Sequence, residues 1–178
     1  MKRKNQVKLL TLLSLTLGVT INVAAAAGYA AVNKDSCNRM QNNRHPFILV
    51  LHSGDDLIKS ITQCAAAAKL LAASVSGLGQ VHNPTLAYFT SNPQDKPTLT
   101  KFDGFYELAS LNGNITNNRD HYYTHIHVAL ADKTFRGITG HLNSTEVGLT
   151  VEVSIIPLSA PVERNVDAKT GFGLIATK

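Results

Sequence analysis

The sequence predicts an α+β domain in which a mostly antiparallel β-sheet packs against one main helix. Apolar residues recur at spacings of three and four over residues 57–71, which is the period of a helix. Six short strand-like runs follow, and the connections between them are mostly of hairpin length, whereas parallel strands need crossovers of a dozen residues or more. A chain of 178 residues, 44% hydrophobic and 16% charged, has the size and composition of one globular domain.

Residues 1–27 have the three-part order of a secretory signal peptide. Basic residues 1–8 precede an apolar run over residues 9–23, and the small residues Ala24 to Ala27 supply an A-x-A cleavage site. A retained membrane anchor is the alternative, but threonine, serine and asparagine dilute the run, which is short for a span. We therefore expect cleavage near Ala26 or Ala27, no retained membrane span, and a periplasmic or secreted protein.

The charge balance argues against nucleic acid as a partner. The chain carries a formal net charge of +5, but four of its basic residues lie in the leader. Their loss leaves 13 basic residues against 12 acidic ones, a charge near +1, without the global positive field of a protein held by phosphates. Aromatic residues make up 6% of the chain and tryptophan is absent, so few side chains can stack on bases.

Residues 28–45 form a polar, Asn-rich extension without periodicity, in which we expect no packing. Cys37 lies in this extension, and Cys64 lies in the predicted helix. Export permits a disulfide between them, which would tie the extension to the core by closing a loop worth roughly 3.5 kcal/mol in the chain-entropy model. Alternatively, Cys64 is a small buried hydrophobe and Cys37 a stray thiol.

The domain proper, residues 46–178, begins with a buried strand over residues 47–51, an apolar run between Pro46 and a Ser-Gly pair. The helix follows, and residues 76–79, with two glycines, predict a tight connection after it. From there the apolar alternation predicts strands over residues 86–89, 98–102, 106–111, 122–130, 138–142 and 149–156.

Four pieces of sequence in this order resemble the PPC domain (plant and prokaryote conserved domain). They are SGLG at residues 76–79, FDGFYELASLNG at 102–113, HIHV at 125–128 and GHL at 140–142. The resemblance implies an antiparallel sheet packed with helix, with the chain assembled as a homotrimer. Plant relatives join the domain to AT-hooks and act on DNA, but this chain has no Arg-Gly-Arg hook and carries an export leader.

Three histidines form the candidate site. Strand alternation places His125 and His127 on one face, with the apolar residues between them on the other. If residues 132–134 form a three-residue hairpin loop, His141 lies directly opposite His125 and diagonal to His127. Three imidazoles at that spacing can share zinc or another divalent metal ion, whereas a two- or four-residue loop would turn His141 to the other face.

These histidines support more than one interpretation. The cluster predicts a module that binds a metal ion or a small ligand, and the same triad with Glu107 as general base would make a metal-dependent enzyme. Alternatively, the histidines tile a polar sheet face or a subunit interface, and Glu107 is a structural partner. DNA binding by analogy with the plant relatives is the third alternative.

Overall fold

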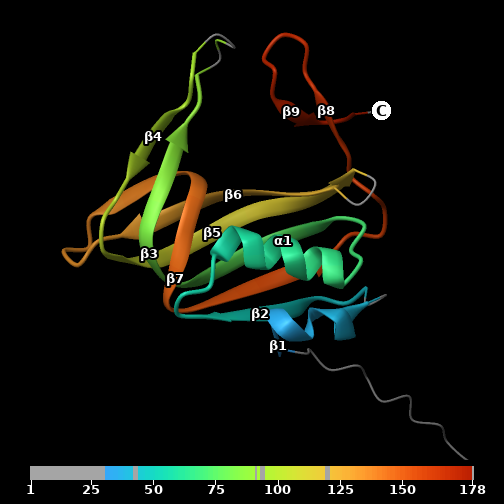
Figure 1. The fold of residues 1–178 in the computed structure, drawn as a ribbon, viewed down its shortest axis with the longest axis horizontal. Helices are drawn as coiled ribbons and strands as arrows, with labels where there is room; N and C mark the ends of the chain where they lie inside the picture. The colour runs from blue at the N-terminus through green and yellow to red at the C-terminus, as the bar shows by residue number, and fades with distance from the viewer. Residues whose placement is uncertain (1–30, 42–43, 91, 93–94, 119–120, 178) are drawn as a thin grey trace, which may run out of the picture.

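The computed structural model describes residues 31–41, 44–90, 92, 95–118 and 121–177. Seven strands form one mixed sheet in the order β1-β2-β7-β6-β5-β3-β4, and β8 pairs with β9 in a separate small sheet (Figure 1). The elements are β1 (Ala31–Asn33), the 3-10 helix η1 (Lys34–Met40), β2 (Phe47–His52), α1 (Leu57–Ala67), β3 (Ala73–Tyr88), β4 (Thr98–Lys101), β5 (Phe105–Asn118), β6 (His121–Ala131), β7 (Gly137–Pro157), β8 (Arg164–Val166) and β9 (Gly173–Ile175). Among these pairings only β1 with β2 is parallel, so the sheet is mostly but not purely antiparallel.

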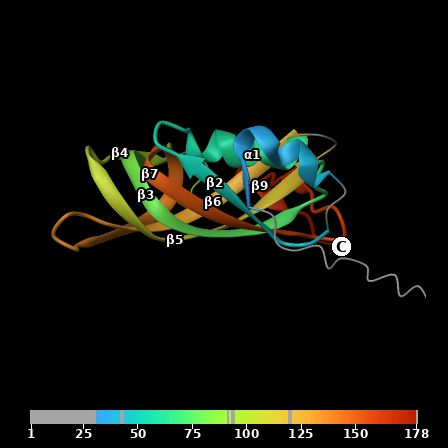
Figure 2. The ribbon, with the colours of Figure 1, turned by 90° about the horizontal axis from the view of Figure 1, so that it is seen from below.

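The helix α1 covers one side of the sheet, as Figure 2 shows from below. Its N-terminus is capped by Asp56, whose carboxylate accepts a hydrogen bond of 2.9 Å from the Lys59 amide. The buried stripe of the helix packs into a single core with apolar residues of the strands, as the period of three and four predicts. The helix ends four residues earlier than expected, because Lys69 takes a left-handed φ of +52°.

Residues 76–79 lie within the sixteen-residue strand β3, so the predicted tight connection there is wrong. Their glycines serve a close approach of two strands, because a Cβ at Gly77 would lie 2.7 Å from the carbonyl oxygen of Glu152 in β7. The pairing of β3 with β5 also shifts register between Gly77 and Gly79, where φ is +145°. Glycine inside a strand commonly marks such a bulge or close approach, and here it marks both.

The last two predicted strands, residues 138–142 and 149–156, belong to the single strand β7. β7 pairs with β6 at its beginning, with β2 near its end, and with β3 over most of its length. Because β3 also pairs with β5 and β5 with β6, the four strands form a closed ring of pairings. This closure brings β3 beside the first part of β7.

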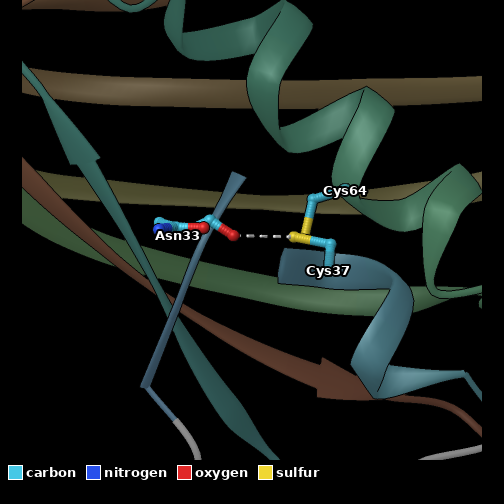
Figure 3. Close-up of a disulfide and its surroundings, with 3 residues drawn as sticks. All are labelled: Asn33, Cys37 and Cys64. Carbon is cyan, nitrogen blue, oxygen red and sulfur yellow. Dashed lines mark hydrogen bonds between the residues drawn. A yellow bond between two sulfur atoms is a disulfide. The ribbon is translucent and has the colours of Figure 1, made fainter. Parts of the chain in front are cut away.

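The N-terminal segment packs against the core, contrary to the expectation of no packing. β1 pairs with β2, and Val32, Cys37 and Met40 are buried. Figure 3 shows the disulfide that joins Cys37 in η1 to Cys64 in α1, with the Cys37 sulfur 3.6 Å from the backbone oxygen of Asn33. Three scattered apolar side chains carry this packing, which is too few to produce a periodic pattern.

Within the described part of the chain, no helix has both the length and the apolar character needed to cross a membrane. The predicted signal peptide, residues 1–27, lies outside the described residues.

Candidate metal centre

The strand β6 presents two chemically different faces. Thr124, Ile126, Val128 and Leu130 point into the core, and the Thr124 hydroxyl lies 2.7 Å from that of Thr62 in α1. The alternate residues His125 and His127 therefore point away from α1, as strand alternation predicts.

The β6–β7 hairpin brings His141 to the same face, with a register different from the expected one. Ala131 pairs with Gly137, so the loop holds five residues rather than three. His141 consequently pairs with His127, and His125 is the diagonal neighbour. Two additional loop residues leave the alternation unchanged, and for that reason all three histidines still share one face.

The longer loop is organised by Asp132. Its carboxylate accepts hydrogen bonds from the Thr134 hydroxyl, the Thr134 amide and the Arg136 amide. The bond from the Thr134 side chain is the main cause that lowers the Asp132 pKa to about 2. An aspartate that accepts bonds from the residues just after it nucleates a turn, and here that turn sets the hairpin register.

The three imidazoles form a compact cluster. The ring centroids are 5.2 Å apart for His125 and His127, 5.0 Å for His125 and His141, and 5.3 Å for His127 and His141. One nitrogen from each ring lies within 4.8 Å of the other two. Nitrogens that share a tetrahedral zinc ion at a bond length of about 2.0 Å are about 3.3 Å apart, so a small inward rotation of the rings fits them to an ion.

The surroundings of two of the histidines favour the neutral form. Burial is the main cause that lowers the pKa of His125 to about 4, and the neighbouring His141, Arg164 and His127 lower it further. Burial and His127 lower the pKa of His141 in the same direction. A neutral imidazole has a free lone pair on one nitrogen, which is the form that binds metal ions.

A pocket of about 470 Å³ opens over the cluster. Its polar residues are the three histidines and Arg164 from β8, whose Nη2 lies 3.4 Å from Nδ1 of His125. The other lining residues are mostly aromatic or apolar, and they come from β3 and the residue after it, from β6 and β7, and from the C-terminal segment: Ala87, Tyr88, Phe89, Tyr123, Gly140, Phe172, Gly173 and Leu174.

The structure does not bring Glu107 to the histidines. Glu107 pairs with Ala131, four residues farther along β6 than His127, which is about 13 Å of strand. Its carboxylate accepts a hydrogen bond of 3.0 Å from the side-chain Nε2 of Gln80 instead. None of the described residues that line the pocket is acidic.

Arg164 and the aromatic side chains that line the pocket were not predicted from the sequence. Arg164 reaches the site because the Asn118 side chain accepts from its backbone amide and so fixes β8 beside β5. Phe89 lies edge-on to both His141 and Phe172. Phe89 comes near His141 because Ala87, two residues before it, pairs with His141. That pairing exists because β3 and β7 meet when the ring of strands closes, and no local sequence pattern predicts it.

Known proteins resemble this chain in fold and sequence. A protein of Bacteroides thetaiotaomicron, named for a suspected role in binding DNA, superposes with a TM-score of 0.71 at 20% identity, over 74% of this chain and 92% of its own. A plant- and prokaryote-conserved (PPC) protein of Pyrococcus horikoshii superposes with a TM-score of 0.68 at 24% identity, over 75% and 92%. A metal-containing protein of Archaeoglobus fulgidus superposes with a TM-score of 0.68 at 30% identity, over 74% and 93%.

No curated protein sequence matches the chain. The sequence profile of the Plants and Prokaryotes Conserved (PCC) domain matches residues 38–159, which is more than half of the chain. This is the family, also written PPC, that the sequence motifs resemble. The chain therefore belongs to it.

Proposed function

We propose that this protein binds a divalent metal ion, zinc in the first place, through His125, His127 and His141. The observation that carries the proposal is the convergence of three imidazole nitrogens within 4.8 Å on one sheet face. Three histidines with an open fourth position are a ligand set that zinc accepts. The metal-containing Archaeoglobus relative, at 30% identity, supports the same assignment.

The electrostatics of the cluster also favour a metal ion. Protons compete with metal ions for imidazole nitrogens, so a lowered pKa makes the ligands available near and below neutral pH. The His125 pKa near 4 and the lowered His141 pKa act in this direction. Arg164 opposes binding by charge repulsion, and the histidine that its guanidinium approaches is His125, with Nη2 at 3.4 Å from Nδ1.

We further propose that the mature protein is exported and works as a homotrimeric binding module. The export proposal rests on the three-part leader of residues 1–27, and a disulfide between Cys37 and Cys64 suits an oxidising compartment. The trimer rests on the family resemblance alone. Cell fractionation tests the first, and light scattering of the purified protein tests the second.

No specific observation favours either alternative function, a metal-dependent enzyme or a DNA-binding protein. A metal-dependent enzyme needs a general base, and Glu107 lies along the sheet away from the pocket. The Bacteroides relative is named for suspected DNA binding, but the mature charge near +1 gives little electrostatic attraction for phosphates.

Zinc titration of the purified protein and two variants tests the proposal. His127→Ala removes one ligand and is expected to weaken zinc binding at least 100-fold. His121→Ala is the matched control, since His121 lies on the same strand but outside the cluster. Equal zinc affinity of the two variants, or no zinc uptake by the unaltered protein, would overturn the proposal.

A further inference from the structure

We infer that the pocket over the histidines binds a small carboxylate with an apolar or aromatic body, whose acid group reaches both Arg164 and the metal ion. The inference rests on the proposed metal site and names the ligand class that this site selects. It follows from the charge of the pocket, the way in which Arg164 is held, and the chemistry of the walls.

The charge of the pocket favours an anion. Arg164 is permanently charged, and none of the described lining residues carries a carboxylate that would offset it. A divalent ion held by three neutral imidazoles adds two further positive charges. Inside a partly buried pocket such charges are weakly screened, so the site attracts a ligand that carries a negative charge.

The guanidinium of Arg164 is fixed before any ligand arrives. Nε donates to the Thr116 hydroxyl at 3.1 Å, Nη2 donates to the Asn114 amide oxygen at 2.8 Å, and Nη1 donates to the Gly173 carbonyl at 2.8 Å. The Tyr123 ring lies 4.9 Å from the guanidinium carbon. Little conformational entropy is therefore lost when a ligand binds to it.

These bonds leave the Arg164 guanidinium with a donor for a ligand. A guanidinium has five N–H groups, and the three bonds to oxygen use one on each nitrogen. Of the two remaining hydrogens, the one on Nη2 is donated towards Nδ1 of His125 at 3.4 Å, and the one on Nη1 is left for another partner. A carboxylate at this place can bind the guanidinium with one oxygen and face the metal position with the other.

The walls require an apolar body on the ligand. Tyr88, Phe89, Phe172 and Leu174 line the pocket, and the Phe89 and Phe172 rings lie 5.4 Å apart. A volume of about 470 Å³ lies within the range of small-molecule sites and far exceeds the needs of a simple inorganic anion. Burial of an aromatic ring against these side chains adds apolar contact that acetate lacks.

Visible absorption of the cobalt(II)-loaded protein tests the inference with benzoate as the probe. Cobalt(II) replaces zinc at such sites, and its absorption bands respond to a new ligand at the open position. The protein is expressed as the full chain and purified as the cell processes it. Benzoate is expected to change the spectrum and to bind at least tenfold more tightly than acetate or the neutral benzamide.

Two Arg164 variants separate its charge from its structural role. Arg164→Gln removes the charge and is expected to weaken benzoate binding at least tenfold while cobalt binding persists. Arg164→Lys keeps the charge, and an intermediate benzoate affinity is expected. Loss of the local structure alone would weaken benzoate and benzamide to the same extent in both variants, which would overturn the role of Arg164.

The remaining outcomes distinguish this inference from the proposed function. Cobalt bands that do not respond to benzoate overturn the carboxylate site and leave the metal site standing. Acetate affinity equal to that of benzoate overturns the apolar part of the inference. Absence of cobalt bands overturns the proposed metal site, and the carboxylate inference falls with it.

Discussion

The two sides of the sheet differ in what they are built to do. On the α1 side, alternate residues of β6 such as Ile126 and Val128 are buried, and the disulfide of Cys37 and Cys64 fastens η1 over the same core. On the other side, His125 and His127 are only partly covered and line an open pocket. The inward side chains of β6 thus stabilise the fold, and its outward histidines form part of the candidate metal site.

Because the two faces carry different side chains, we expect that the fold and the site can be altered separately. A change on the α1 side removes apolar burial, which acts on the free energy of unfolding. A change on the histidine side removes partly exposed polar groups that few core contacts depend on, so it acts on ligands.

Ile126→Ala is expected to lower the free energy of unfolding by about 2–5 kcal/mol, because Ile126 is 1% exposed and its loss leaves a cavity. Its neighbour provides the matched variant: His127→Ala is expected to change the free energy by less than about 0.5 kcal/mol without metal. Urea unfolding of both metal-free variants, followed by circular dichroism, measures the contrast. A His127→Ala loss as large as that of Ile126→Ala would contradict the division between the faces.

Replacing both Cys37 and Cys64 by alanine is expected to lower the free energy of unfolding by up to roughly 3.5 kcal/mol, because the unfolded chain gains conformational entropy when the loop is no longer closed. Zinc affinity is expected to stay within twofold, since the disulfide lies on the α1 side. The unaltered protein with and without reductant serves as the control in the same unfolding experiment. Unchanged stability would show that the disulfide contributes nothing, and a large loss of zinc affinity would show that the two sides are coupled.

The metal-free protein is expected to lose stability as the pH falls from 6.5 towards 4. His125 has its ordinary pKa of about 6.5 when unfolded but about 4 when folded, so only the unfolded state takes up the proton in this interval. Proton uptake by the unfolded state favours unfolding, and the lowered His141 pKa acts in the same direction. Urea unfolding at several pH values between 4 and 7.5 measures the free energy of unfolding as a function of pH. This free energy is expected to depend less on pH in His125→Gln than in the unaltered protein. An equal dependence in both proteins would refute the role of His125.

The local pattern was sufficient to predict much of the fold and the core of the candidate site. Alternation around His125 and His127 fixed their shared face, and the position of His141 depended only on an odd number of loop residues. The exact pairing was mispredicted because Asp132 accepts hydrogen bonds from residues as far along as Arg136, which lengthens the loop from three residues to five.

Features that depend on distant partners could not be predicted. Gly77 and Gly79 look like turn residues until β7 is known to pass close to them. Arg164 lies 39 residues beyond His125 in the chain, and hydrogen bonds to residues distant in the sequence, among them Asn114, Thr116 and Asn118, hold it at the site. Such positions are determined by tertiary contacts, which no period within a single segment encodes.

The most direct test of the metal site is a crystal structure of the zinc-loaded protein with anomalous data collected at the zinc edge. We predict one anomalous peak on the face of β6 turned away from α1, about 2.0–2.1 Å from a nitrogen of each of His125, His127 and His141. A zinc peak bound at other residues, or no peak between the three rings after loading, would contradict it.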